Sequence, residues 1–171
     1  TEWHDLQVNE INRLPLHTLH FAYDPNDFAG TGAEYLDKKK SMNYLSLDGT
    51  WKFNWVANAD QRPTDFYKTD LDDSKWKNIQ MPGNWEMLGY GQPEYVNVGF
   101  AWRGHFNQQP PAVPTKDNHV GSYRREINIP ANWDGKRVIA HFGSVTSNIY
   151  LYVNGQFAGY AEDSKVAAEF D

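Results

Sequence analysis

The 171-residue sequence contains no cysteine, so neither a disulfide nor a thiol can contribute to its chemistry. It also lacks an apolar run of about 18 residues, which a membrane-spanning helix requires. Basic residues are in the minority, with 16 Lys and Arg against 22 Asp and Glu, and the formal net charge is −6. Nucleic acid and anionic membranes are therefore not expected as partners, because both attract a basic face.

Aromatic residues, in contrast, are abundant. The chain has 7 Trp, 10 Tyr and 9 Phe, and its length suits one domain with a sizeable core. Short apolar and aromatic alternations are separated by turn residues, and no segment keeps a helical period. This pattern predicts an all-β protein, built as an antiparallel β-sandwich of jelly-roll type.

A hairpin around Asn154-Gly155 is the clearest local signal. Asn-Gly readily supplies the positive φ that both central positions of a type I′ turn need, and it joins strands predicted at 149–153 and 156–160. The first strand has large side chains on both faces, so we expect the hairpin to lie inside a sheet that is covered on both sides. The turn predicts the pairs Val153–Gln156, Tyr152–Phe157 and Leu151–Ala158.

Further strands are expected at residues 51–55, 76–81, 123–129 and 138–142. Residues 1–45 have no sustained period and are expected to form an extended arm and loop, and 162–171 is expected to be a loop. A jelly-roll has about eight strands, whereas five or six are recognisable here. We therefore expect a jelly-roll domain at 46–171 whose last strands lie beyond Asp171.

Residues 83–119 predict one long loop, because Pro and Gly recur there without any alternation. Loops of this length inside a compact domain are commonly functional. Carbohydrate sites combine aromatic faces with amide, carboxylate and guanidinium groups, and the loop supplies Asn84, Trp85, Glu94, Tyr95, Asn97, Phe100, Trp102, Arg103 and His105. We expect the loop as a whole to take part in recognition, although packing is the simpler role for any single aromatic.

Catalytic groups are not evident in the sequence. Glycoside hydrolysis needs two carboxylates across the scissile bond, and no spacing pairs any two of the loop acids Glu86, Glu94, Asp117, Glu162 and Asp163. No serine lies in a Gly-X-Ser-X-Gly motif, and the six His show no metal-binding spacing. Glu2, Asp5 and Glu162 carry oxygen donors that suit Mg²⁺ or Ca²⁺, but solvated surface acids are the simpler interpretation of their spacing.

Several motifs follow one another in a familiar order: Asn12-Arg13-Leu14-Pro15, Leu47-Asp48-Gly49-Thr50-Trp51, Pro82-Gly83-Asn84-Trp85, Pro93-Glu94-Tyr95-Val96-Asn97-Val98 and Pro110-Pro111-Ala112-Val113-Pro114. From about Trp3 to Asp171 the chain resembles the start of the large bacterial β-galactosidases of glycoside hydrolase family 2. The Leu-Asp-Gly-Thr-Trp and Pro-Gly-Asn-Trp motifs are shared with the β-glucuronidases and β-mannosidases of that family. The Asn-Arg-Leu-Pro and Pro-Pro-X-Val-Pro motifs resemble those that are specific to the β-galactosidases within this family.

This resemblance implies the jelly-roll sugar-binding domain that opens these enzymes, followed by Ig-like domains and a TIM barrel. In the family both glutamates of the retaining mechanism lie on the barrel, so no catalytic residue is expected in this chain. The parent protein is then expected to hydrolyse terminal non-reducing β-D-galactose residues in β-galactosides, and the 171-residue portion alone is expected to be inactive.

The resemblance also assigns site residues. The family's Tyr-X-Asn-Val segment contacts galactose through its Asn, which is Asn97 here. A peripheral Mg²⁺ site of the family would take side-chain oxygens of Glu2, Asp5 and Glu162 and the backbone carbonyl of Val8, with at least one further ligand beyond Asp171. The segment 99–106 is a few residues longer than in the best-known member, which implies a reshaped rim of the sugar site.

Two alternatives remain open: a stand-alone carbohydrate-binding module without catalysis, and a family 2 glycosidase for another sugar. The expected partners are a β-galactoside substrate, the remaining domains of the same polypeptide and further copies of the protein in a homo-oligomer. The resemblance is to bacterial proteins, and either the cytoplasm or the periplasm is compatible with this chain.

Overall fold

A computed structural model describes residues 2–21, 23–24, 27, 37–93 and 112–171. In these ranges the regular structure consists of β-strands and single turns of 3-10 helix. The strands are β1 (Glu10–Ile11), β2 (Gly49–Val56), β3 (Lys77–Met81), β4 (Val120–Arg124), β5 (Ala140–Phe142), β6 (Asn148–Val153), β7 (Gln156–Glu162) and β8 (Ala168–Phe170). The predicted all-β class is confirmed. In the described ranges we find no helix with the length and apolarity to cross a bilayer.

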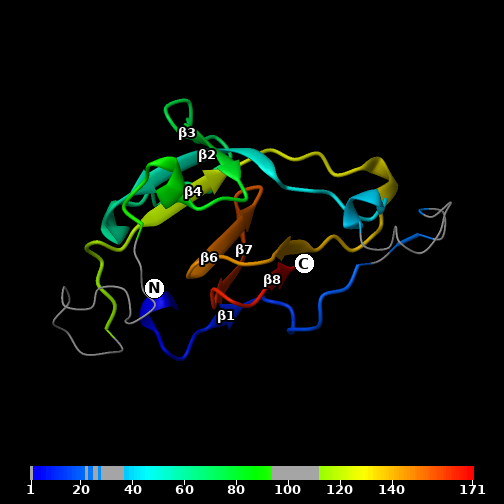
Figure 1. Cartoon of the computed structure of the whole chain (residues 1–171), viewed down its shortest axis with the longest axis horizontal. Helices are drawn as coiled ribbons and strands as arrows, with labels where there is room; N and C mark the ends of the chain where they lie inside the picture. The colour runs from blue at the N-terminus through cyan, green and yellow to red at the C-terminus, as the bar shows by residue number, and fades with distance from the viewer. Residues whose placement is uncertain (1, 22, 25–26, 28–36, 94–111) are drawn as a thin grey trace.

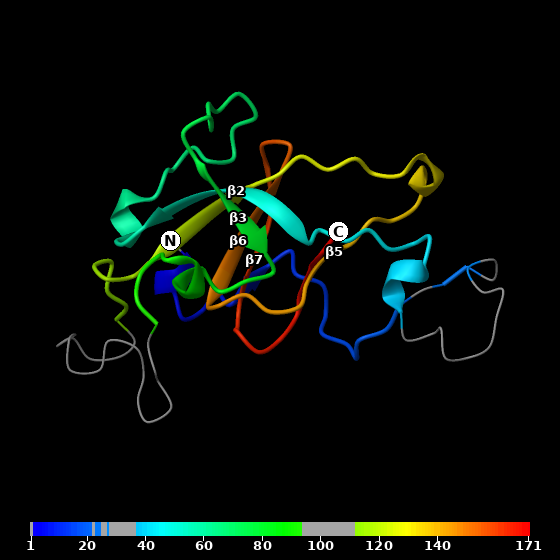
Figure 2. The same cartoon turned by 45° about the horizontal axis from the view of Figure 1, so that its top comes forward.

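The strands form antiparallel sheets in two layers. One sheet has the order β3-β2-β4, a second has the order β1-β7-β6, and β5 pairs with β8. Figures 1 and 2 show the β3-β2-β4 sheet on one side of the molecule and the β6–β7 hairpin crossing beneath it. The strands lie in the sandwich arrangement that the turn-separated alternation predicts.

The count of five or six strands was too low, because eight lie in the described ranges. The additional strands are β1 in the N-terminal arm and β8 within the segment expected to be a loop. Each is only two or three residues long, so neither shows an alternation that a sequence pattern can detect. Both are defined by partners far away in the chain: Ile11 pairs with Tyr160, and Phe142 pairs with Ala168.

The Asn154-Gly155 turn forms as predicted, with φ of 49° and 81° at the two residues. The pairs Val153–Gln156 and Tyr152–Phe157 are confirmed, but the third predicted pair is wrong because Leu151 lies opposite Gly159. A bulge between Leu151 and Tyr152 leaves Ala158 out of the ladder. The carbonyl of Ala158 accepts a hydrogen bond from Asn12 Nδ2 at 3.1 Å instead.

The expectation that the whole hairpin lies inside its sheet holds for only one of its two strands. β7 is the central strand between β1 and β6, whereas β6 is an edge strand of the described sheet. The position of β7 explains its burial, since Tyr160 is 0% exposed and Ala161 is 2% exposed. Along β6 both faces are half-buried up to Tyr152, which accounts for the large side chains on both of them.

The strand predicted at 123–129 is confirmed at residues 123–124 and wrong at residues 125–129. β4 begins earlier, at Val120, and ends at Arg124. The guanidinium of the next residue, Arg125, donates from Nη1 to the carbonyls of Leu47 and Asp48 at 2.6 and 3.0 Å. Ile127 and Ile129 beyond it are each 46% exposed. Their alternation is real, but no described strand pairs with them.

The N-terminal arm runs along the edge of the β7 and β8 strands. Glu10 pairs with Ala161, the backbone N–H of Leu14 donates to the carbonyl of Glu169 at 2.9 Å, and Arg13 Nη2 donates to the carbonyl of Ala167 at 3.0 Å. Residues 9–14 of the arm thus make hydrogen bonds with the sandwich.

Candidate functional site

The hairpin supports a pair of tyrosines that connects two of the predicted metal ligands. The Tyr150 hydroxyl donates to Glu2 Oε2 at 2.7 Å, and the Tyr160 hydroxyl donates to Glu162 Oε1. Because Tyr150 and Tyr160 are a cross-strand pair on β6 and β7, their rings lie 4.5 Å apart. The structure therefore brings the start of the arm and the end of β7 to the same two side chains.

Burial and these hydrogen bonds change the acidity of the groups. Burial raises the pKa of both tyrosine hydroxyls, and the hydrogen bonds to Glu2 and Glu162 raise them further. The pKa of the Glu2 carboxyl is lowered, first by a hydrogen bond from its own backbone N–H and then by the Tyr150 hydroxyl. Glu2 is thus a carboxylate at neutral pH and accepts a charge-assisted hydrogen bond.

The other two predicted metal ligands belong to the same turn of the arm. The backbone N–H of Asp5 donates to the carbonyl of Glu2 at 2.7 Å, and that of Val8 donates to the carbonyl of Asp5 at 3.0 Å. The Asp5 carboxylate is exposed and accepts from the backbone N–H of Gln7 at 3.0 Å. Over the described ranges, no three His, Cys, Asp or Glu side chains are arranged to hold a metal ion. Mg²⁺ binding by these residues therefore stays a prediction.

The predicted sugar contact, Asn97, lies outside the described residues, as do six of the other eight loop groups expected to recognise sugar. Of the nine, Asn84 and Trp85 are described. They lie at the start of η6 (Trp85–Leu88), one turn of 3-10 helix that ends at Gly89 with φ of 91°. The segment 83–119 is therefore not wholly irregular, and its described ends can be followed onto the sheet.

An aromatic layer on the β3-β2-β4 sheet supports these ends. Phe53 of β2 is 1% exposed, and its ring centroid lies 4.7 Å from that of Tyr123, 4.9 Å from that of Tyr90 and 6.2 Å from that of Trp85. Burial raises the pKa of Tyr123 to about 12, with a smaller contribution from the charge of Glu86. Packing is thus the observed role of Trp85, in agreement with the simpler interpretation of the loop aromatics.

Trp55 packs against residues on both sides of the segment that includes Asn97. Its ring centroid lies 6.4 Å from that of Tyr90, just before the segment, and 5.0 Å from that of His119, just after it. Gly91 lies against the rings of Trp55 and His119. We call these four residues, Trp55, Tyr90, Gly91 and His119, the Trp55 cluster. Sequence reasoning missed it, although the Gly-Tyr-Gly run at 89–91 was a signal for a close backbone approach.

A second cluster joins the arm to the C-terminal strands. The Glu169 carboxylate on β8 accepts from His17 Nε2 at 2.7 Å and from His141 Nδ1 on β5 at 2.8 Å. His17 Nδ1 also lies 2.8 Å from the carbonyl of Thr18. Both nitrogens of His17 thus face oxygen acceptors, which only a protonated ring can satisfy. Accordingly, the hydrogen bonds to Thr18 and Glu169 raise the pKa of His17.

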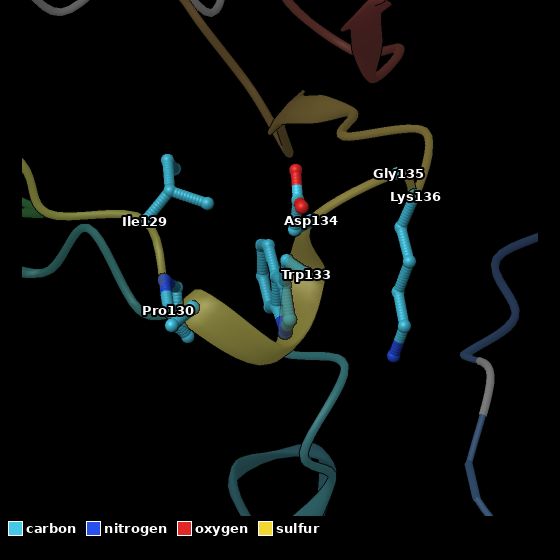
Figure 3. A pocket seen from close by; sticks show the side chains of 7 residues that line it. Ile129, Pro130, Trp133, Asp134, Gly135 and Lys136 are labelled. Carbon is cyan, nitrogen blue, oxygen red and sulfur yellow. The ribbon is translucent and has the colours of Figure 1, made fainter.

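A surface pocket of about 400 Å³ is formed around η7 (Ala131–Trp133) by Ile129, Pro130, Ala131, Trp133, Asp134, Gly135 and Lys136 (Figure 3). Trp133 Nε1 donates to the carbonyl of Met42 at 2.7 Å, and Lys136 Nζ donates to Asn43 Oδ1 at 2.9 Å. These bonds attach the segment before β2 to η7. The pocket contains none of the predicted site residues, so we do not assign the sugar site to it.

Comparison with known proteins identifies the family. Residues 44–171 match the family described as glycosyl hydrolases family 2, sugar binding domain. The chain is 39% identical over 167 residues to a β-galactosidase of Halalkalibacterium halodurans and 40% identical over 167 residues to one of Lactobacillus delbrueckii subsp. bulgaricus. These alignments cover 98% and 97% of this chain but 16% of each relative.

Among solved structures, a mutant of Bacteroides uniformis β-glucuronidase 2 is similar in fold. The TM-score is 0.50 at 21% identity, over 74% of this chain and 12% of the other. The family match covers more than two thirds of the 171 residues, and the fold agrees with it. The chain belongs to the sugar-binding domain family of the family 2 glycosyl hydrolases.

Proposed function

We propose that this chain is the sugar-binding domain of a retaining β-galactosidase that removes terminal non-reducing β-D-galactose from β-galactosides. The observation that carries the proposal is the identity of 39–40% to β-galactosidases along nearly the whole chain. The chain spans 16% of the length of these relatives, so the catalytic glutamates are proposed to lie in other domains of the same polypeptide.

Within this function, we propose that Asn97 hydrogen-bonds the galactose. Two described features support a role of its segment in recognition: the segment is flanked on both sides by the Trp55 cluster, and Tyr90 adds an edge-on contact with the buried Phe53. Aromatic contacts of this kind are stabilising, and here they hold residues on both sides of the segment against the sheet. The domain would then contribute substrate contacts rather than acid–base chemistry.

The remaining partners are proposals too. Mg²⁺ would be held by the carboxylates of Glu2, Asp5 and Glu162 and the carbonyl of Val8, and it would join the arm to the end of β7 as a hard cation with oxygen ligands. The Tyr150–Tyr160 pair supports this by bringing Glu2 and Glu162 to neighbouring positions. Assembly into a homo-oligomer and a bacterial cytoplasmic or periplasmic location are proposed on the family resemblance.

The test is turnover of nitrophenyl glycosides of β-galactose, β-glucuronic acid, β-mannose and β-glucose by the whole protein. We expect a clear preference for the galactoside. In Asn97→Ala, the transition state should lose roughly 1–3 kcal/mol of binding, measured as a decrease in kcat/KM, because one hydrogen bond is left unmade. Turnover of another glycoside would favour a different family 2 specificity. Sugar binding without any turnover would favour a carbohydrate-binding module.

A further inference from the structure

Two of the strands expected from the sequence are shortened on the sides that face η7. The strand expected at 123–129 ends at Arg124 as β4, and the strand expected at 138–142 begins at Ala140 as β5. The segments left over, 125–129 and 138–139, lie on the two sides of η7 along the chain, and Figures 1 and 2 show both outside the strand arrows. Both shortenings thus concern the same end of the sandwich.

The apolar side chains of these two segments are exposed. Ile127 and Ile129 are each 46% exposed, and Val138 and Ile139 are 36% and 43% exposed. Within 125–129 the isoleucines alternate with polar residues, which is the pattern of a strand with one face in a core. Exposed apolar groups in such a pattern mark a surface that another element covers.

The backbone beside these isoleucines also lacks partners within the described part of the chain. β4 is an edge strand of the β3-β2-β4 sheet, and its pairing with β2 ends where Arg124 lies opposite Lys52. For residues 126–129 we find no backbone hydrogen bond to another described residue. Unpaired N–H and C=O groups along an extended edge are a template for one more strand.

We propose that residues 125–129 accept a β-strand of the same polypeptide, one that follows β8 in the chain and covers Ile127 and Ile129 with its inward side chains. The relatives support this source, because the matched part makes up 16% of their length and the rest is available to supply the strand. The inference rests on the part of the proposed function that makes this chain one domain of a longer polypeptide. It does not depend on which glycoside is hydrolysed.

The direction of β8 supports the position of the strand after it. β8 is antiparallel to β5, with Phe170 opposite Ala140. Beyond this pair, Arg137 Nε donates to Asp171 Oδ2 at 2.6 Å. The chain that leaves β8 is therefore directed along residues 139–137 toward η7, the end of the sandwich at which 125–129 is unpaired.

Hydrogen exchange in the whole protein, followed by mass spectrometry of peptides that span 125–129, tests the backbone pairing. Amides on the paired edge should exchange at least about a hundredfold more slowly than in an unstructured peptide, because the strands must separate before exchange. Exchange of all amides in 126–129 at the unstructured rate would overturn the inference. Protection that disappears when the protein is diluted would also overturn it, because a second copy would then be the partner.

Ile127→Asp and Asn128→Asp test the two faces of the segment in the same protein. Ile127→Asp would place a carboxylate beneath the added strand, so the Tm should fall by at least about 5 °C. Asn128 is exposed and its side chain alternates to the other face, so Asn128→Asp should stay within about 2 °C of wild type. Equal Tm values for the two variants would refute the cover over Ile127.

Turnover of the nitrophenyl β-galactoside separates this inference from the proposed function. An active enzyme with unprotected amides at 126–129 would overturn the added strand and leave the proposed β-galactosidase function intact. Protected amides and a sensitive Ile127 in a protein that hydrolyses no galactoside would overturn the proposed activity and support the strand.

Discussion

The hydroxyl of Tyr150 on β6 donates a hydrogen bond to the carboxylate of Glu2, which lies 148 positions earlier in the chain. The distance from the hydroxyl oxygen to Glu2 Oε2 is 2.7 Å. This bond fastens the first turn of the arm to the sheet. It also keeps the two predicted Mg²⁺ ligands Glu2 and Glu162 on neighbouring side chains. The relationship leads to a direct test of how much the arm contributes to stability.

Tyr150→Phe should destabilise the protein by about 1 kcal/mol, because it removes the hydrogen bond to Glu2 and keeps the ring that packs on Tyr160. The free energy of unfolding in urea measures the effect. Tyr152→Phe is the matched control: its ring lies in an aromatic cluster, 4.7 Å from that of Tyr67, and its hydroxyl has no hydrogen bond to another of the described residues. An equal loss in both variants would contradict a role of the Glu2 bond.

Gly159→Ala should be strongly destabilising, by roughly 1–3 kcal/mol or more, because the new methyl group overpacks a buried site. A Cβ there would lie 2.5 Å from the Phe170 ring and 2.7 Å from the carbonyl oxygen of Ile11. At Gly143 the nearest heavy atom would be the far end of His141, at 3.8 Å, so Gly143→Ala should be nearly neutral. Thermal unfolding of the two variants tests the difference, and similar Tm values would refute the predicted clash.

Arg124→Ala should cost about 2 kcal/mol of stability, because it removes three hydrogen bonds of a half-buried guanidinium. Arg124 Nε donates to Asp73 Oδ2 at 3.0 Å, and Nη1 donates to the carbonyls of Phe66 and Lys68. These bonds hold the loop between β2 and β3 on β4.

The control for Arg124 is Arg137→Ala. Arg137 pairs with Asp171 at 2.6 Å, but both side chains are about half exposed, and such surface pairs contribute at most about 1 kcal/mol. Urea unfolding should therefore rank Arg124→Ala well below Arg137→Ala in stability. The reverse order would show that the loop between β2 and β3 is held by other contacts.

Glu169, His17 and His141, which we call the Glu169 cluster, predict a pH dependence. The raised pKa of His17 means that its contribution is complete below the unfolded value of 6.5 and is lost as the pH rises through the higher folded value. For Glu169, burial raises the pKa, but the hydrogen bonds from His141 and His17 outweigh burial and lower it. Its contribution is therefore complete above 4.5 and is lost as the pH falls through the lower folded value.

Glu169→Gln should thus lower the urea midpoint most between pH 4.5 and 6.5, and the difference from wild type should shrink above this window. Hydrogen exchange at the backbone N–H of Leu14, which donates to the Glu169 carbonyl, should report the same loosening of the arm. Glu126→Gln, at an exposed position, makes the same chemical change as a control. A difference that stays as large well above pH 6.5 as it is within this window would disprove the histidine linkage.

Local sequence determined the parts of this protein that depend on neighbours in the chain. The Asn154-Gly155 turn and the first two pairs beside it follow from φ preferences of two residues. The β2 strand follows from the alternation of Trp51, Phe53 and Trp55. The family resemblance also grouped Glu2 with Glu162, although no spacing in the sequence connects them. In the structure the two carboxylates accept hydrogen bonds from one pair of neighbouring tyrosines.

Only the tertiary structure decided features in which distant segments compete for the same space. The third hairpin pair shifts by one residue, and this places Gly159 against Phe170, where the space beside the ring admits only a residue without a side chain. The predicted strand at 123–129 ends early, at Arg124, and the side chain of the next residue, Arg125, reaches the carbonyls of Leu47 and Asp48. The Trp55 cluster and the Glu169 cluster arise in the same way, since each gathers residues whose proximity depends on packing between strands rather than on any pattern along the chain.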